Sequence, residues 1–476
     1  MITMRTVIKS RREEGAAILL VLAAVMVLLI LGAAIFLVAR VSLERAAANT
    51  DSGRALAAAE AGLQNAASTL AGSPVVPSAT PVTMALQDMA GDGQYEVSYV
   101  APTALPWFSI TSTGYYASKA DALGKRRLKA ECFALSPWDF IYAGGMTGAT
   151  VNGNVKVHGP FYVNDNLTMS GTAGVYGGPL ILYNTSAPGN ADAILDSASA
   201  SIGTSGKNIT VFIDGQISGH MNSVYTDVVY PWAPELTFPE LTEDELKKYR
   251  AVPADSPWLG DVERPTAVWD SDYVTDIDTA LTFSKTSKPL PTDSQFKGSG
   301  VSWTWSGSKG DDLTITFDNS GGVHPILFVD GDLTMDGGSG GLNSVRYEGI
   351  GTIVASGKIA ISGNLVPTGS TLTGSPAACA GFPGTNALGL ITRGKVNFEG
   401  QQDEWLAAAV YAGGEATFSK QGNLRGALVT REMNLGNQVP ELWAEGGFSF
   451  KLPPRMPGAD NRIKSIIGWT ELSPYP

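Results

Sequence analysis

The sequence predicts a chain of two parts: a long transmembrane α-helix followed by a small antiparallel sheet, and then a mostly-β body. Three observations support this fold class. Residues 16–39 form an uncharged apolar run, residues 40–72 continue with helical spacing, and the remainder is rich in glycine (55 in the chain) with only 16% charged residues overall. High glycine content with little charge favours short strands joined by tight turns.

The apolar run of residues 16–39 is long enough to cross a membrane. It covers about 24 residues, or roughly 36 Å as a helix, against a hydrocarbon core of ~30 Å. A secretory signal has a shorter apolar region of about 7–15 residues and a small-residue cleavage site, which residues 37–48 do not resemble. The preceding residues are basic, with Arg5, Lys9, Arg11 and Arg12. We therefore expect a retained single-pass anchor in the cell membrane, with a cytoplasmic N-terminus and an extracytoplasmic body.

The helix is expected to continue outside the membrane over residues 40–72. Apolar residues recur there at intervals of three and four, namely Leu56, Ala59, Leu63, Ala66 and Leu70. Gly72, Ser73 and Pro74 supply a stop. The pattern thus predicts one helix of more than about fifty residues.

A small sheet is expected over residues 73–135. Three segments, 93–101, 107–117 and 125–135, alternate apolar and polar residues and are separated by links that contain glycine or proline. We expect them to form an antiparallel sheet that covers the outer half of the helix.

Residues 11–135 resemble a type IV pilin or pseudopilin. The resemblance consists of a basic leader (residues 1–15) ending in Gly15, an apolar helix after it, and a helix-plus-sheet ectodomain. Its most specific element is Ala59, Glu60, Ala61, Gly62 and Leu63, which is similar to the N-terminal region of PilX-like minor pilins. The resemblance implies cleavage by a prepilin peptidase between Gly15 and Ala16. It also implies other pilins or pilus assembly proteins as partners, bound through the helix.

Two positions depart from the family pattern. Major pilins carry Glu at the fifth mature position, where this chain has Leu20, and commonly begin with Phe, where it has Ala16. The missing glutamate fits an initiating or tip component better than a bulk subunit, or a protein that uses the leader only as an anchor.

The body, residues 136–476, carries a loose repeat of an apolar pair, a polar pair, glycine and an alternating strand. Glycines at 331, 357, 394 and 414 mark this unit. Short strands with glycine corners are what a parallel β-helix (β-solenoid) requires, because glycine permits positive φ at a corner. The alternative is a β-sandwich, which does not demand the same unit at every pass.

An insertion is expected at about residues 231–322. It begins rich in proline and acidic residues, and Thr242 with Glu245 forms a capping box that opens a short helix. A strand is expected at DLTITF, residues 312–317. A loop of this size would be a lateral cover on the coils or a binding surface. We expect the tail, residues 462–476, to cap the last coil or to pair with the body.

The sequence holds few residues that suggest chemistry. A net charge of −12 argues against a nucleic-acid partner. The histidines His158, His220 and His324 lack zinc-site spacing. Asp330, Asp332 and Asp336, near glycine corners, are a weak calcium candidate whose spacing does not match a calcium-binding repeat, and solvated corner residues are the simpler interpretation. We expect no cofactor.

The two cysteines, Cys132 and Cys379, both fall on the expected outer side of the membrane. A disulfide between them is permitted there. Two separate buried thiols explain the sequence equally well, because the cysteines lie far apart along the chain.

A structural and assembly role in a pilus or pseudopilus, with a head displayed for adhesion or surface interaction, is the function we expect, and not an enzyme. The alternative is an anchored β-helix that binds or degrades surface polysaccharide, and a plain unprocessed anchor is a third interpretation. Degradation would need paired carboxylates. The candidates for this pair are Asp311 and Asp312, or Asp270, Asp272, Asp276 and Asp278, and the candidates for carbohydrate contact are Trp258, Trp269, Trp303 and Trp305.

Overall fold

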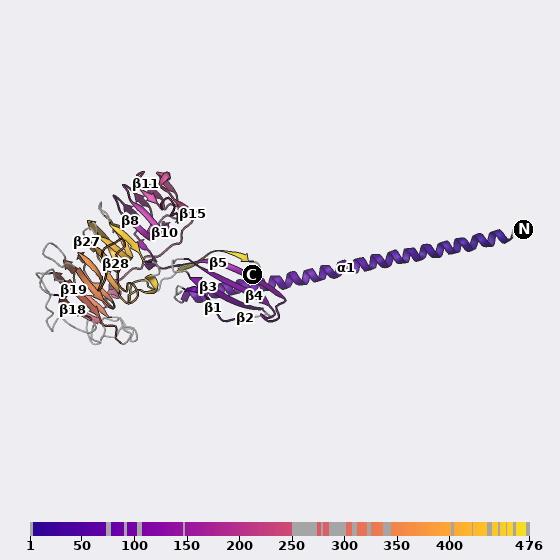
Figure 1. Ribbon diagram of the computed structural model, residues 1–476, viewed down its shortest axis with the longest axis horizontal. Helices are drawn as coiled ribbons and strands as arrows, with labels where there is room; N and C mark the ends of the chain where they lie inside the picture. The colour runs from indigo at the N-terminus through magenta and orange to yellow at the C-terminus, as the bar shows by residue number, and fades with distance from the viewer. Residues whose placement is uncertain are drawn as a thin grey trace.

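The computed structural model contains a long helix, a small sheet and a large β head (Figure 1). The residues that it describes are 3–72, 78–89, 93–101, 107–145, 148–249, 274–277, 279–284, 301–306, 312–320, 325–336, 344–400, 404–420, 422–435, 440–445, 448–453, 455–459 and 463–472. We call residues 136–459 the head.

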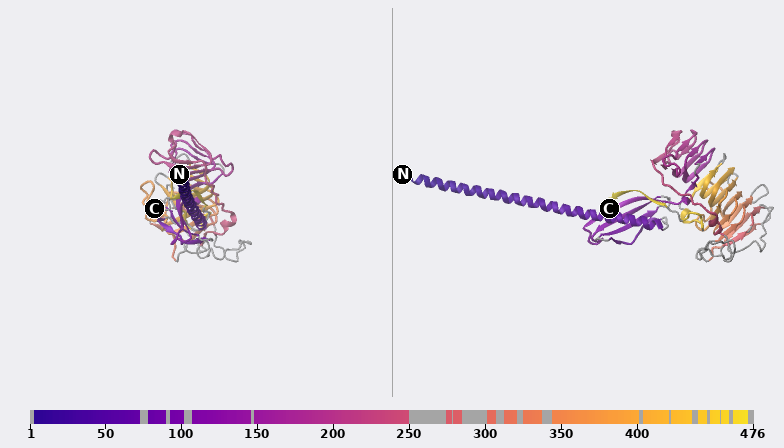
Figure 2. Two further views of the ribbon diagram at one scale, coloured as in Figure 1. Left: turned by 90° about the vertical axis from the view of Figure 1, so that its right-hand side faces the viewer. Right: turned by 180° about the vertical axis from the view of Figure 1, so that it is seen from behind.

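A single helix, α1 (Thr3–Gly72), runs without a break from the leader through the apolar segment to the expected stop. Its 70 residues confirm one helix that continues past residue 40. Among the described residues it is the one helix long and apolar enough to span a membrane. The second view of Figure 2 shows that its first half projects away from the rest of the protein.

The small sheet has six strands in the described part of the chain, and it packs on the second half of α1. Their order is β1-β3-β4-β5-β31, with β2 on β3, and all pairs are antiparallel. The bounds are β1 (Ser78–Thr83), β2 (Gln87–Met89), β3 (Gly93–Ala101), β4 (Trp107–Tyr116), β5 (Gly124–Leu135) and β31 (Ile463–Leu472). The three predicted strands are therefore present as β3, β4 and β5.

Strand β31 differs from the expectation for the C-terminal tail. It pairs with β5 as an edge strand of the small sheet, instead of capping the last coil or pairing with the body (Figure 1). The head is consequently an insertion between two neighbouring strands of the small sheet, and the expected body of residues 136–476 loses its last strand to that sheet. The physical reason is that β5 pairs with β4 on one side only, and β31 supplies hydrogen bonds to its other edge.

Within its described residues, the head contains a sheet of 25 strands. Its strands before the insertion are β6 (Ile141–Ala143), β7 (Ala149–Val151), β8 (Lys156–Asn164), β9 (Leu167–Met169), β10 (Gly174–Tyr183), β11 (Ala193–Leu195), β12 (Ser201–Ile202), β13 (Ile209–Ile213), β14 (Ile217–Gly219) and β15 (Thr226–Tyr230). The later strands are β16 (Val274–Ile277), β17 (Leu281–Ser284), β18 (Val301–Ser306), β19 (Asp312–Phe317), β20 (Ile326–Val329), β21 (Leu333–Asp336), β22 (Ser344–Glu348), β23 (Ile350–Ala355), β24 (Ile359–Ser362), β25 (Asn364–Pro367), β26 (Ala387–Thr392), β27 (Val396–Gly400), β28 (Trp405–Lys420), β29 (Asn423–Asn434) and β30 (Glu441–Ala444).

Pairing in this sheet is largely parallel. Among the described strands, β18 and β19 form the one antiparallel pair, and every other pair joins a strand to one from another turn of the chain. Strands β16 to β19 belong to the sheet, so the expected insertion of 231–322 is shorter than predicted. A β-sandwich is built from antiparallel strands, so the parallel pairing argues against the β-sandwich alternative.

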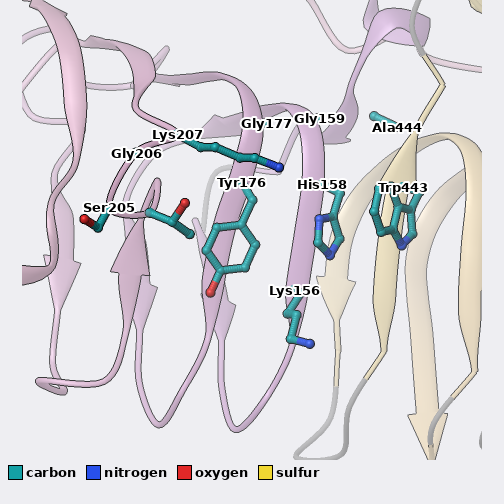
Figure 3. Close-up of a pocket in the computed structure, with 11 residues that line it drawn as sticks. Lys156, His158, Gly159, Tyr176, Gly177, Ser205, Gly206, Lys207, Trp443 and Ala444 are labelled. Atoms are coloured by element: carbon teal, nitrogen blue, oxygen red, sulfur yellow. The ribbon is translucent and has the colours of Figure 1, made fainter. Parts of the chain in front are cut away.

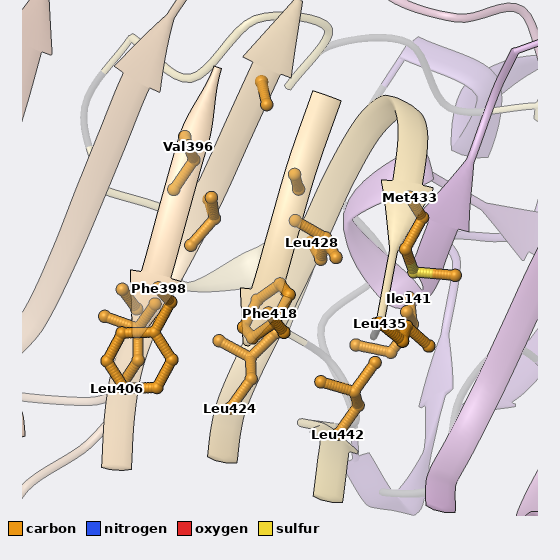
Figure 4. Close-up of a cluster of buried hydrophobic side chains, with 14 of the residues drawn as sticks. Ile141, Val396, Phe398, Leu406, Phe418, Leu424, Leu428, Met433, Leu435 and Leu442 are labelled. Carbon is orange, nitrogen blue, oxygen red and sulfur yellow. The ribbon is translucent and has the colours of Figure 1, made fainter. Parts of the chain in front are cut away.

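The two sequence halves of the head meet in the middle of this sheet. Strand β29, near the end of the chain, pairs with β6, and β30 pairs with β8. The ends of the stack, at β15 and β16, therefore come from the middle of the sequence. Figure 4 shows one apolar core running through the meeting point, with Leu428, Leu442 and Ile141 in neighbouring layers, all fully buried.

The glycines of the repeat form a column at one corner. Of the four, Gly331 has a positive φ of 147°, and Gly357, Gly394 and Gly414 do not. Gly357 and Gly414 are needed for close approach instead. A Cβ on Gly357 would lie 2.8 Å from the carbonyl carbon of Gly331, and one on Gly414 would lie 2.9 Å from the carbonyl oxygen of Gly394. The expected positive φ thus holds at one of the four corners.

Candidate functional site: the bare half of the helix and a groove on the head

The first candidate site is the apolar half of α1. Its side chains are exposed wherever the structure describes them, with Leu20 at 73% and Phe36 at 69% of full exposure. From Leu20 to Ala39 the sequence has no charged residue. An apolar surface of this size requires a membrane or partner helices to cover it.

The second half of α1 is covered by the small sheet. Ala59 and Leu63 pack against strands β3 to β5 in a core with Val97, Ile110 and Leu128. Glycines bring the two layers close together. A Cβ on Gly62 would lie 2.3 Å from the Ser112 Oγ, and one on Gly114 would lie 2.1 Å from the Ala55 carbonyl oxygen.

The five residues of the resemblance motif, 59–63, differ in how far they are buried against the sheet. Ala59, Gly62 and Leu63 are buried against the sheet, Ala61 is half-buried, and Glu60 is exposed. The motif therefore contributes to the helix–sheet contact through its small and apolar members. Gly15 and Ala16 both lie within α1, and the structure describes only their backbone.

One outward face of the head is covered by the chain itself. We call residues 231–249 the strap; it contains the short helix α2 (Glu243–Lys247), and the predicted capping box of Thr242 and Glu245 is present. Tyr142 donates a hydrogen bond of 2.7 Å to the Leu236 carbonyl, and Tyr411 donates one of 2.6 Å to the Pro239 carbonyl. The strap is thus a lateral cover on the coils.

Backbone N–H groups of the strap also donate hydrogen bonds to tyrosine hydroxyls of the head. The Leu236 N–H donates to the Tyr162 hydroxyl at 3.0 Å, and the Leu241 N–H donates to that of Tyr411 at 3.0 Å. The ring of Phe238 stacks between those of Tyr142 and Tyr411, with centroids 6.2 and 5.7 Å away. Burial raises the pKa of the Tyr142 and Tyr411 phenols well above the ordinary value, so both remain hydrogen-bond donors.

The second candidate site is an open groove on another face of the head, where its two halves meet (Figure 3). We call it the groove; its cavity measures about 850 Å³. It is lined by Lys156, His158, Gly159, Tyr176, Gly177, Thr204, Ser205, Gly206, Lys207, Trp443 and Ala444.

A row of three rings crosses the groove. Trp443, His158 and Tyr176 come from β30, β8 and β10, which are successive neighbours in the sheet. The Trp443 and His158 rings stack at 3.7 Å between centroids and 6° between planes. The Tyr176 ring is 5.5 Å from that of His158 and tilted by 45°. The Tyr176 ring leans over Gly174, where a Cβ would lie 2.0 Å from its hydroxyl oxygen, and this hydroxyl is 3.1 Å from the Ser201 Oγ.

His158 is enclosed by these rings. Its Nε2 is buried and has no hydrogen-bond partner in the described part of the structure. Burial lowers the pKa of His158; Glu441 acts in the opposite direction, and Lys156 adds to the lowering. The imidazole is therefore kept neutral between Trp443 and Tyr176.

The charged groups of the groove are mainly basic. Lys156 forms a 3.0 Å ion pair with Glu441, which also accepts a hydrogen bond from the Trp443 indole at 3.3 Å. Lys207, on the Thr204–Lys207 turn, is exposed and makes no ion pair within the described residues. Its side chain points from the turn toward the strand that carries His158 (Figure 3).

The three predicted calcium ligands are not brought together. Each bonds instead to the next coil: the Asp330 carboxylate accepts from the Ser356 hydroxyl, Asp332 from the Lys358 N–H, and Asp336 from the Ser362 hydroxyl. Across the described ranges, no three His, Cys, Asp or Glu side chains gather as metal ligands would.

The two cysteines are free and lie in different cores. Cys132 is buried under the small sheet, where burial raises its pKa to about 12, and Cys379 is buried in the head, where burial also raises its pKa. No disulfide joins them. Both are structural thiols with little thiolate at neutral pH.

Most of the other sequence candidates lie outside the described structure. Asp270, Asp272, Asp278, Asp311, Trp258, Trp269 and His324 lie outside the described residues, as do the side chains of Asp276, Asp312 and Trp305. Trp303 is packed edge-on against Phe283, 5.4 Å between centroids, so it belongs to a local core.

The ring row of the groove was not anticipated from the sequence. A signal for it exists: the tetrapeptides KVHG (156–159), GVYG (174–177) and ELWA (441–444) share an aromatic third position and align in register. The alignment can be recognised only when the boundaries of the coils are known.

No protein-family model matches this chain, and neither does any curated protein. Among solved structures, the competence-associated pilin ComZ from Thermus thermophilus is similar at 17% sequence identity, over 88% of this chain and 97% of that one, with a TM-score of 0.40. A TM-score of this size does not establish a common fold, so the proposals below rest on the geometry described above.

Proposed function

We propose that this chain is a minor-pilin-like component of a type IV pilus or pseudopilus that displays a β-helical head at the cell surface. The observation that carries the proposal is the division of α1 into a bare apolar half and a half covered by the small antiparallel sheet. A plain anchor could be joined to its body by a flexible linker. An unbroken helix fixed by a sheet instead supplies a rigid element that can pack beside other helices.

The β-helix part of this proposal is supported by the three rows of parallel pairs in the head. Each row continues across the meeting of β29 with β6 or β7, or of β30 with β8. Inward side chains of all rows share one core. A parallel β-helix buries its apolar residues in this way.

The apolar residue Leu20, at the position where major pilins carry Glu, bears on the place of the chain in a filament. The apolar half of α1 carries no charge that could pair with a neighbouring subunit, so its contacts in a filament would be apolar packing alone. We propose an initiating or tip position, where the large head has room, and not a repeated place along the shaft.

The test is the mature N-terminus of the protein from its native host, measured by mass spectrometry with and without the prepilin peptidase. We expect a chain that begins at Ala16 only when the peptidase is present. An intact start at Met1 in both strains would overturn the pilus assignment and leave a plain anchor.

A matched pair of variants separates cleavage from insertion. Gly15→Leu should abolish the cut, whereas Gly32→Leu should leave it intact, because a Cβ on Gly32 would meet no other atom within 4 Å. Equal processing of both variants would contradict cleavage after Gly15.

A further inference from the structure

We propose that the groove binds an acidic polysaccharide, a glycan whose sugars carry uronic-acid carboxylates. The inference deepens the proposed function by naming what the displayed head recognises, and it rests on that function only for where the head is presented. Its evidence is the ring row, the lysines and the shape of the cavity.

The rings provide the apolar part of a sugar site. Trp443 covers one side of His158, and the Tyr176 ring, tilted against that of His158, lines the same cavity as the Thr204–Lys207 turn (Figure 3). Ligand sites combine aromatic surface with a few placed polar groups. The apolar C–H face of a pyranose ring fits such a surface, and its hydroxyls can reach the side chains of Thr204 and Ser205.

The charges point to an acidic glycan. The chain as a whole carries −12, yet the groove presents two lysines, of which Lys156 already has Glu441 as a partner. Lys207 remains available for a carboxylate of the ligand. A charge-assisted hydrogen bond to a carboxylate is stronger than a neutral one, and a local basic patch on an acidic protein selects acidic ligands.

A glycan fits better than a nucleic acid. The Trp443 and His158 rings are only 3.7 Å apart and parallel, so no base can insert between them. Single-stranded nucleic acids need successive stacking platforms and a track of positive charge along the backbone. Among the described residues the groove presents one lysine without an ion pair, Lys207, which can hold one uronate carboxylate but is no track of positive charge along a phosphate backbone.

The groove is arranged for binding and not for cleavage. Glycoside hydrolysis ordinarily requires two carboxyl groups on either side of the bond. In the described part of the chain, Glu441 is the one carboxylate that an interaction joins to a lining residue, and Lys156, Ser375 and Trp443 already bond to it.

The experiment measures binding of the full chain in detergent micelles to two uronic-acid polymers, polygalacturonate and alginate, by calorimetry. We expect binding to at least one polymer and loss of binding to the methyl-esterified form of that polymer. This readout does not depend on processing at Gly15, so its failure and the failure of the pilus assignment are distinguishable.

Variants locate the site. Lys207→Ala, at an exposed position, should weaken binding about tenfold, and Tyr176→Ala should weaken it at least as much. The matched control is Tyr183→Ala, because Tyr183 lies on the same strand β10 but its hydroxyl bonds to Glu235 of the strap. Lys358→Ala, an exposed lysine of the other half of the head, is the control for charge.

Three results would overturn the proposal: no binding of either polymer, binding unchanged in both Lys207→Ala and Tyr176→Ala, or binding of an oligothymidylate that exceeds binding of the polymers and is lost in the same variants. Retained circular dichroism in each variant excludes a folding defect as the cause of a loss.

Discussion

Two rows of aromatic side chains lie on the outside of the same β head. One row is buried under the strap, and the other is exposed to solvent in the groove. Tyr142, Tyr162 and Tyr411 are fully buried because the strap covers them and its backbone bonds to their hydroxyls. Trp443, His158 and Tyr176 are half-exposed along the groove. An aromatic row on the outside of the head can therefore pack against another segment of the same chain, or it can remain exposed and available to a ligand.

This contrast indicates which rings hold the head together. A ring whose hydroxyl bonds to backbone groups under a cover contributes both apolar burial and satisfied polar groups. A ring in the groove stacks on its neighbours but keeps part of its surface in water. Substitutions under the strap should lower stability, and substitutions in the groove should mainly alter binding.

The largest effect is expected for Tyr142→Ala. Removing a fully buried aromatic ring leaves a cavity under the strap and should lower the free energy of unfolding by about 3–5 kcal/mol. The measurement is denaturant unfolding followed by tryptophan fluorescence, with Tyr176→Ala as the groove counterpart, for which we expect a smaller loss. Equal losses in both variants would remove the distinction between the two rows.

A smaller effect is expected for Tyr411→Phe. This change keeps the ring but leaves the Pro239 carbonyl and the Leu241 N–H without their partner, at a cost of about 1–3 kcal/mol. Tyr176→Phe removes only the contact with Ser201 at a half-exposed site and should cost less than about 1 kcal/mol. Denaturant unfolding measures both variants. A larger loss of unfolding free energy for Tyr176→Phe than for Tyr411→Phe would contradict the conclusion that the strap row, and not the groove row, stabilises the head.

The smallest effect is a pH dependence from His158. Burial lowers its pKa in the folded protein, while the unfolded chain has a value of about 6.5. The unfolded state then binds more protons below about pH 6.5, so the free energy of unfolding should fall as the pH is lowered from there. We expect His158→Gln to lose this part of the slope, and the exposed His220→Gln to keep it. Identical slopes in the wild type and His158→Gln would show that the groove does not enclose a neutral imidazole.

Local patterns predicted the elements whose sequence signal is local. The apolar spacing from Leu56 to Ala66 indicated the outer half of α1, the alternation around Val97 indicated β3, and the Thr242 capping box indicated α2. In each case the residues that form the pattern are neighbours along the chain, although the apolar faces of α1 and β3 pack against distant segments. Periodicity and capping therefore contain the required information.

Pairings between distant segments were not predictable in the same way. Nothing local in residues 463–472 distinguishes a strand that joins β5 from one that caps a coil, and the choice depends on which edge remains open. The meeting of β29 with β6 has the same origin. The groove follows from that meeting, since Trp443 and His158 are neighbours only because β30 pairs with β8.

The amino-acid order alone accounts for the apolar helix, its rigid continuation, the three central strands of the small sheet and the β character of the head, because hydrophobic period and glycine content act within a few residues. Three further features required the folded chain: the insertion of the head between β5 and β31, the cover of the strap over one aromatic row, and the opening of the other row to solvent. These features depend on hydrogen-bonding edges and apolar faces that lie far apart along the chain and become neighbours only when the coils stack.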